Sequence, residues 1–194
     1  QGYGRIEYAY HLMARRAGIV MSDCRLFEEG GRAHFMTRRF DRPDDGGKRH
    51  FASLFGLAHL AYAAPGAHGH AYEDYFAVIE KLNLPPDAKV EGFRRMVFNV
   101  LGCNRDDHIK NWGCRLTEAG QWELAPAFDI SYAHNPEPGK WTATQQMSVA
   151  GKRANITRDD FITIGRSCGV ATVPKLNGII ELVAEALRQW QEVA

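Results

Sequence analysis

The sequence has few of the features that mark secreted, membrane-spanning or zinc-binding proteins. It contains four cysteines in 194 residues, and no two of them form a C-x-x-C pair. A dense disulfide framework and a structural zinc site therefore lack support, and a reducing cytoplasm is the expected location. No apolar run reaches the roughly 18 residues of a membrane-spanning helix, and no signal peptide is evident. The chain begins with Gln1 rather than Met, so we expect it to be part of a longer polypeptide.

Neither sign of charge dominates the chain. Lys and Arg number 24, Asp and Glu number 23, and the formal net charge is +1. The composition thus gives no overall attraction to nucleic acid or to an anionic membrane. The sequence also lacks the alternation of aromatic and basic residues that is typical of a nucleic-acid-binding surface. We therefore expect no direct nucleic-acid binding and no membrane binding, and any function that depends on charge must be local.

Hydrophobic periodicity predicts a mainly helical α+β fold. Helical spacing is found in residues 5–17, 51–64, 72–82 and 86–101, in a segment beginning near Thr157, and in a last one from about Pro174. That last helix is expected to bury Leu176, Ile180, Val183, Leu187 and Trp190. Short antiparallel hairpins are expected around 30–31 and around 118–120. Segment 41–50 is rich in proline, glycine and charge, which is typical of a linker or lobe boundary.

The stretch "LGCNRDDHIKNWG", residues 101–113, carries the strongest chemical signal. Asp106 is followed five positions later by Asn111, and Asp129 comes eighteen positions after that, in "PAFDIS". Protein kinases use an Asp and an Asn at this spacing, with a separate Asp after a short hairpin. Phosphoryl transfer requires oxygen ligands for Mg²⁺ and a carboxylate that orients the attacking hydroxyl. The spacing indicates Asp106 for the hydroxyl, Asn111 and Asp129 for the metal, and His108 or Lys110 as a cation near the phosphates.

Four segments together resemble the HipA family of bacterial serine/threonine kinases, the toxin halves of toxin–antitoxin pairs. "NRDDHIKN" and "WELAPAFDIS" are similar to the family's D-x-H-x-K-N loop and to its L-x-P-x-Y-D-type metal segment. "RIEYAYHLMARRAGI" resembles the helix before the last N-lobe hairpin. "RRFDR", residues 38–42, resembles the segment where the lobes join and the adenine docks. The similarity runs in one order from about residue 5 to 190.

The resemblance implies an ATP- and Mg²⁺-dependent protein kinase and assigns its residues. Asp106 would be the catalytic base, with His108 and Lys110 as catalytic-loop residues near the phosphates and Asn111 and Asp129 as metal ligands. The nucleotide would be met by Phe40 and Asp41 at the hinge, and Glu7 would pair with a phosphate-binding lysine. Residues 1–42 would be a remnant of the N-lobe with the hinge, and residues 43–194 a helical C-lobe. The sequence departs from the family at Phe128, where tyrosine is usual, and at Arg38, where a glutamate can occur.

The same resemblance implies a cytoplasmic bacterial toxin. Its substrate would be a protein of translation, such as an aminoacyl-tRNA synthetase, and its restraining partner a helix-turn-helix antitoxin. Only six residues precede Glu7, too few for the Gly-rich loop and strand lysine of a kinase. We therefore expect residues 1–194 alone to bind ATP poorly and to transfer little or no phosphate. Two alternatives stay open: a catalytically idle kinase-fold module that binds an antitoxin or other protein, and a magnesium-dependent nuclease or phosphohydrolase.

Overall fold

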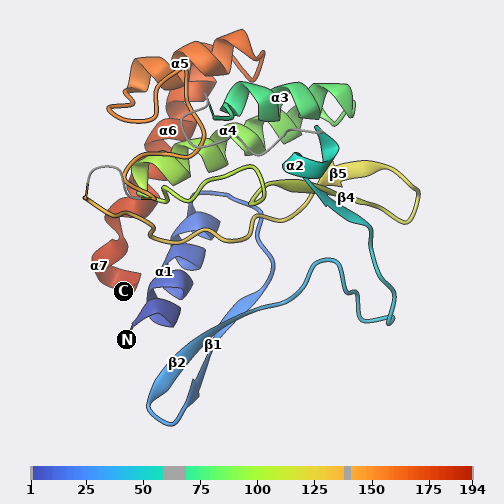
Figure 1. Ribbon diagram of the computed structural model, residues 1–194, viewed down its shortest axis with the longest axis vertical. Helices are drawn as coiled ribbons and strands as arrows, with labels where there is room; N and C mark the ends of the chain where they lie inside the picture. The colour runs from blue at the N-terminus through green and yellow to red at the C-terminus, as the bar shows by residue number, and fades with distance from the viewer. Residues whose placement is uncertain (1, 59–68, 138–140, 194) are drawn as a thin grey trace.

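The computed structural model describes residues 2–58, 69–137 and 141–193, in which helices form most of the body and two small antiparallel sheets lie beside it (Figure 1). The helices are α1 (Tyr3–Arg16), α2 (Leu54–Leu57), α3 (Tyr72–Lys81), α4 (Pro86–Leu101), α5 (Arg158–Ser167), α6 (Val173–Arg188) and α7 (Trp190–Val193). The strands are β1 (Cys24–Glu29), β2 (Arg32–Thr37), β3 (Phe51–Ser53), β4 (Gly113–Leu116) and β5 (Trp122–Leu124). This arrangement confirms the predicted α+β class.

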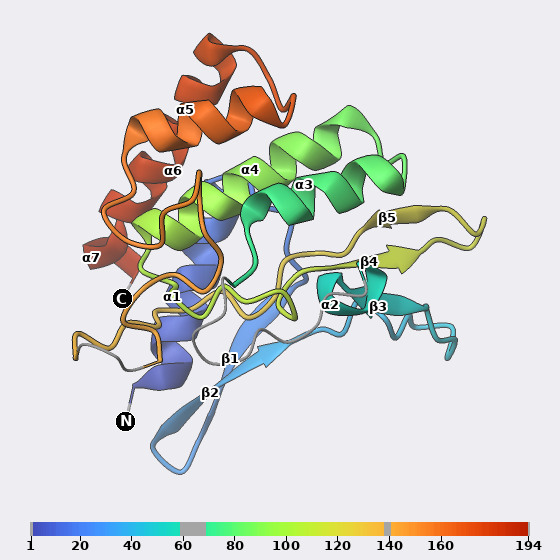
Figure 2. The same cartoon turned by 45° about the horizontal axis from the view of Figure 1, so that its top comes forward.

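Helix α4 is the central element of the helical body. Its apolar stripe places Phe93, Met96 and Val97 fully inside the core, each 0% exposed. Helix α3 packs against α4, and α6 packs against α4, α5 and α1. Figure 2 shows α3 and α4 side by side, with α5 and α6 beyond α4. The burial of this stripe is the main source of stability in such a layered helical domain.

The first sheet is the hairpin of β1 and β2, which extends away from the helical body beside α1 (Figure 1). Cys24 lies opposite Thr37 along the six paired positions. The link is the predicted pair Gly30 and Gly31, with positive φ angles of 56° and 75°. Glycine adopts such angles without the steric cost that a Cβ would add, so this pair suits a tight turn. Helix α1 contacts both this hairpin and α6; the division of the chain at residue 42 stays a prediction.

The second sheet has the strand order β3-β4-β5 and corrects one prediction. Strands β4 and β5 form the hairpin expected around 118–120. Phe51–Ser53, however, was expected to begin a helix and instead forms a strand, with Phe51 opposite Arg115. Pairing with β4 satisfies the backbone groups of these residues, and the helix begins only at Leu54. The rest of that predicted helix, from residue 59 on, lies outside the described residues.

The two C-terminal helices follow the predicted pattern except at the end. Helix α5 begins after Thr157, whose amide and hydroxyl both donate to Asp160 at 2.8 Å. Helix α6 buries Leu176, Ile180 and Val183, and Leu187 is partly buried, as expected. Trp190 is 38% exposed, so its predicted burial is wrong. Because α6 ends at Arg188, Trp190 leaves the helical phase of the stripe and contacts Tyr10 edge-on. Among the described helices, none combines the length and apolarity needed to cross a membrane.

Candidate active site

The polar loop 102–112 leaves the C-terminal end of α4 and is anchored where it begins. The carbonyl of Gly102 accepts a hydrogen bond from the Tyr10 hydroxyl of α1. The Arg105 amide donates to the Ala133 carbonyl at 2.9 Å, and the Ala133 amide donates back to the chain at residue 103. The loop is therefore joined at its start to the first helix and to the segment that follows β5.

Asp106, the predicted base, presents a partly exposed carboxylate. Its side chain is 39% exposed, and its Oδ1 accepts a hydrogen bond from Trp141 Nε1 at 2.8 Å. Nε2 of His108 lies 3.7 Å from the same oxygen. The backbone carbonyl of Asp106 accepts a hydrogen bond from Asn111 Nδ2 at 2.9 Å. The predicted base and one predicted metal ligand are thus directly connected.

Asn111 and Asp129 line one small cavity, together with Asn104 and Asp107. Its volume is about 10 Å³, on the order of one water-sized sphere. The Asn111 amide directs its N–H toward Asp106, so its oxygen is the group that can serve a cation. Asp129 is exposed and has φ 56°, an uncommon backbone state that occurs often at functional sites. The structure therefore brings the two predicted metal ligands to one place.

Glu7 on α1 lies within electrostatic reach of Asp129. Burial raises the pKa of Glu7, and the negative charge of Asp129 raises that pKa further. A divalent cation near two carboxylates would relieve this repulsion, because it supplies the opposing charge. Glu7 also lines a separate depression with Tyr3 and Arg32, beside the first hairpin. Its predicted pairing with a phosphate-binding lysine stays a prediction.

His108 and Lys110 take different directions from the loop. His108 is half-buried beside the Asp106 carboxylate. The Lys110 ammonium lies 5.5 Å from the centre of the Phe55 ring in α2, a cation–π contact. The lining of the small cavity includes neither side chain. The structure places His108 next to the predicted base and Lys110 near α2, and their roles toward phosphates stay predictions.

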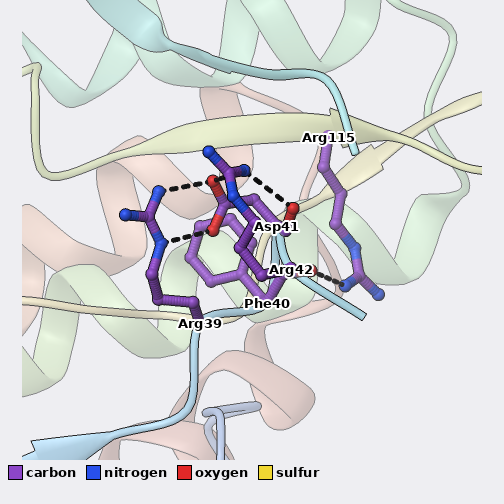
Figure 3. A network of polar contacts seen from close by, with 5 residues as sticks. All are labelled: Arg39, Phe40, Asp41, Arg42 and Arg115. Carbon is purple, nitrogen blue, oxygen red and sulfur yellow. Dashed lines mark hydrogen bonds and ion pairs between the residues drawn. The ribbon is translucent and has the colours of Figure 1, made fainter. Parts of the chain in front are cut away.

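The hinge residues Phe40 and Asp41 sit among arginines (Figure 3). Arg39 donates two hydrogen bonds to the Asp41 carboxylate, at 2.8 and 2.6 Å, and Arg42 donates a third at 2.6 Å. The Arg39 guanidinium is the main cause that holds the pKa of Asp41 below its usual range. Arg115 of β4 donates to the Phe40 carbonyl at 3.2 Å. The predicted hinge is therefore fixed to the second sheet, and its Asp41 carboxylate is held by two arginines.

Three phenylalanine rings connect this hinge to the metal segment. The ring centres of Phe40 and Phe51 are 5.3 Å apart, and Phe128 lies 5.9 Å from Phe40 and 5.7 Å from Phe51. Such separations are typical of packed aromatic pairs. Phe128 directly precedes Asp129, so this packing helps to fix the backbone at the predicted metal ligand. Nucleotide contact by Phe40 and Asp41 stays a prediction.

Sequence reasoning missed two residues that the structure places at the site. Asp107 belongs to the loop, but its side chain is turned inward and is 0% exposed; burial raises the pKa of its carboxyl despite several hydrogen bonds. Its place beside Asp106 in a D-D pair was the one available signal. Trp141 donates to Asp106 from 35 positions further along, and no local pattern marks it.

The donor set fits magnesium better than zinc or another transition metal. In the described ranges, no group of three or more His, Cys, Asp or Glu side chains is arranged to hold a metal. Mg²⁺ is commonly held by one or two carboxylates, with water and substrate phosphates completing the octahedron. The Asp129 carboxylate and the Asn111 amide oxygen beside this water-sized cavity match that mode. The Asp107 carboxylate in the same lining already accepts three hydrogen bonds from protein donors. The residues that could hold the ion are Asn111 and Asp129.

A polar loop after a buried helix, followed by a hairpin and a second aspartate, is the arrangement found in the catalytic lobe of a kinase-like fold. The solved structure of HipA from Shewanella oneidensis MR-1, in complex with HipB and operator DNA, aligns with a TM-score of 0.79 at 17% identity, over 97% of this chain and 49% of that one. The Helicobacter pylori proinflammatory kinase CtkA aligns with a TM-score of 0.61 at 12% identity, over 100% of this chain and 84% of that one.

The chain belongs to the family of the HipA-like C-terminal domain, whose model matches residues 1–191. The Sinorhizobium fredii (strain NBRC 101917 / NGR234) protein named "Putative kinase Y4dM" is 24% identical over 203 residues, covering 95% of this chain and 47% of that protein. The chain therefore spans about half the length of this relative and of the Shewanella HipA. These findings confirm the resemblance drawn from the sequence motifs.

Proposed function

We propose that the chain is the catalytic lobe of an ATP- and Mg²⁺-dependent protein serine/threonine kinase of HipA type. The observation that carries this proposal is the proximity of three residues: Asn111 and Asp129 line one cavity, and the Asn111 side chain donates a hydrogen bond to the backbone carbonyl of Asp106. The family and the fold support the kinase class. The Gly-rich loop would come from outside residues 1–194, because the chain covers only 47% of the Sinorhizobium relative and 49% of the Shewanella HipA.

In the proposed reaction, the Asp106 carboxylate accepts the hydrogen of a serine or threonine hydroxyl. The hydroxyl oxygen forms a bond to the γ-phosphorus of ATP, the bond to the β,γ-bridging oxygen breaks, and ADP leaves with that oxygen. Asn111 and Asp129 would hold Mg²⁺, which neutralises the phosphate charge when it is bound. His108, beside Asp106, would add positive charge when protonated.

The family supports a partner of the antitoxin kind. The Shewanella HipA structure contains HipB and operator DNA. We propose a similar helix-turn-helix antitoxin for this chain, with any DNA contact made through that partner. An aminoacyl-tRNA synthetase as substrate rests on the resemblance alone, and a cytoplasmic location rests on the resemblance and on the cysteine usage; both stay predictions.

A metal titration separates the three candidate functions. The chain in its complete polypeptide is titrated with Mn²⁺, a spectroscopic substitute for Mg²⁺, with and without a non-hydrolysable ATP analogue. A kinase should bind Mn²⁺ tightly only when the ATP analogue is present. A binding module should bind neither Mn²⁺ nor the analogue, and a hydrolase should bind Mn²⁺ without the analogue. Asp129→Asn should weaken the nucleotide-dependent binding, and Asp87→Asn, an exposed carboxylate at the start of α4, serves as the control.

A further inference from the structure

The Asp107 carboxylate is completely buried, and it receives hydrogen bonds from outside its own loop. Tyr72 donates its hydroxyl to Oδ2 at 2.7 Å, and Gln145 donates its Nε2 to the same oxygen at 3.1 Å. The backbone amide of Gln146 donates to Oδ1 at 2.7 Å. All three donors are neutral. A buried carboxylate needs such donors, because it has lost its hydration.

The donors come from two parts of the chain that are distant in sequence from the loop. Tyr72 is the first residue of α3, 35 positions before Asp107, and Gln145 lies 38 positions after it. The Gln145 side chain also donates to the Asn104 carbonyl at 3.2 Å. One carboxylate therefore ties the loop to α3 on one side and to segment 145–146 on the other.

The same network extends to α4 and to the metal segment. Asn99 of α4 donates to the Tyr72 hydroxyl at 3.3 Å, and Asn104 donates to Asn99 Oδ1 at 3.0 Å. The Asn104 amide also lies 3.4 Å from the Asp129 carbonyl, as a weak donor. Asp107, Asn104 and Asn99 all line the small cavity of the candidate metal site. The buried network thus forms the inner wall of that site.

Because Asp107 is buried, the adjacent Asp106 is the carboxylate that faces solvent. Asp107 is 0% exposed, whereas the adjacent Asp106 side chain is 39% exposed. Two adjacent carboxylates cannot both be buried here at low cost, since Asp107 receives three hydrogen bonds whereas the Asp106 carboxylate receives one, from the exposed Trp141. The hydrogen bonds to Asp107 therefore favour the loop orientation in which the Asp106 side chain points outward.

We infer that Asp107 is a positioning residue, which holds loop 104–111 so that Asp106 and Asn111 are presented beside Asp129. This role rests on the proposed kinase function for its catalytic consequence. It acts through Asp106 and Asn111, and Asp107 itself does not touch the substrate. The order that it imposes on the loop can be measured without any activity.

The test compares Asp107→Asn with the wild-type chain in its complete polypeptide. The asparagine side chain has the shape of the aspartate side chain, but one of its two oxygens is replaced by an NH₂ group. In either orientation this NH₂ faces another donor, the backbone N–H of Gln146 or Nε2 of Gln145, so one hydrogen bond is lost. We expect hydrogen exchange of the amides in 104–111 to rise by about 10-fold or more, and kcat to fall about 100-fold, a typical result of misplacing a catalytic group by about 1 Å. The KM for ATP should change less than about 3-fold.

Two further variants keep the test decisive. Asp160→Asn removes hydrogen bonds from a carboxylate that is also buried, at the start of α5, and should lower the melting temperature without changing loop exchange or kcat. Tyr72→Phe removes one donor and leaves the Asp107 carboxyl group in place, so it should give a smaller effect in the same amides even if Asp107→Asn does not fold.

The outcomes separate this inference from the proposed function. If Asp107→Asn and Tyr72→Phe leave exchange in 104–111 and kcat at wild-type values, the positioning role is overturned. The same holds if they only lower the melting temperature, as Asp160→Asn does. If the wild-type protein transfers no phosphate but exchange rises in the Asp107 variant, the kinase proposal fails and the loop-holding role of Asp107 stands.

Discussion

The indole Nε1 of Trp141 lies 2.8 Å from Oδ1 of Asp106 and donates a hydrogen bond to it. Asp106 is the carboxylate proposed to accept a proton from the substrate hydroxyl, and Oδ1 also faces His108 at 3.7 Å. A hydroxyl substrate would need a carboxylate oxygen that is available at the same place. The indole would therefore compete with the substrate hydroxyl for this one acceptor oxygen.

Trp141→Phe is expected to raise phosphoryl transfer by the complete polypeptide. The substitution keeps an aromatic ring and removes the N–H donor. A hydrogen bond of this kind contributes roughly 0.5–1.5 kcal/mol, which corresponds to an increase in kcat of about 2- to 10-fold. The rate is measured by transfer of labelled phosphate to protein. Trp122→Phe, an indole in β5 that stacks edge-on with His50, is the matched control and should leave kcat unchanged. A lower rate in Trp141→Phe would show that the indole supports the base.

Asp106→Asn is expected to lower kcat by roughly 10²- to 10⁴-fold, the usual contribution of a positioned base. The fold should be preserved, because the asparagine oxygen can still accept the bond from Trp141, and Asn111 bonds the backbone carbonyl rather than the side chain. Circular dichroism and the melting temperature check the fold, and Asp87→Asn is the control for the loss of one charge. A kcat equal to that of the wild type would remove Asp106 from the role of base.

The fold could be predicted where local pattern and tertiary packing agree. The stripe on α4 is one example, since Phe93, Met96 and Val97 recur at helical spacing and are all buried. The prediction was wrong at Phe51, because its pairing with β4 depends on residues more than 60 positions away. The predicted C-terminal helix runs too far, to Trp190, because no proline or glycine marks the end of α6 near Arg188.

The residues of the candidate site could likewise be predicted only in part. The spacing of Asp106, Asn111 and Asp129 is a local chemical pattern, and it indicated residues that the fold places together. Asp107 and Trp141 could not be predicted, because their roles depend on contacts across 35 or more positions. A sequence shows which side chains can ligate or accept a proton; it does not show which buried donors fix their orientation.

Glu91→Gln is expected to lower the free energy of unfolding by about 3 kcal/mol. Glu91 is 8% exposed and accepts bonds from Arg95 at 2.8 Å, Arg94 at 2.7 Å and the Val20 amide at 3.0 Å. The amide leaves two buried or half-buried guanidinium groups without their counter-charge, and breaking a buried pair typically costs about 3–5 kcal/mol. Urea unfolding measures the difference.

The control for this prediction is Glu185→Gln. Glu185 pairs with Arg188 at 2.7 Å, and both side chains are more than 60% exposed. An exposed pair of this kind contributes about 0–1 kcal/mol, so the control should unfold close to the wild type. Equal losses in the two variants would contradict the structural role assigned to the buried glutamate.

The Asp160 carboxylate should make the stability of the protein depend on acid pH in a defined window. Lys152, followed by the amide and hydroxyl of Thr157, lowers the pKa of Asp160 to about 2 from an ordinary value of 3.8. A carboxyl whose pKa is lower in the folded state stabilises the fold above its unfolded pKa, and this contribution is lost as pH falls through the folded pKa. The urea midpoint of the wild type should therefore exceed that of Asp160→Asn at pH 6, and the two midpoints should converge between pH 3.8 and about 2.

The control for this pH dependence is Asp159→Asn, a substitution of an exposed neighbour in the same helical turn, which should show little of it. A constant gap between wild type and Asp160→Asn down to pH 2 would mean that the carboxylate is not held in its charged form by Lys152 and Thr157.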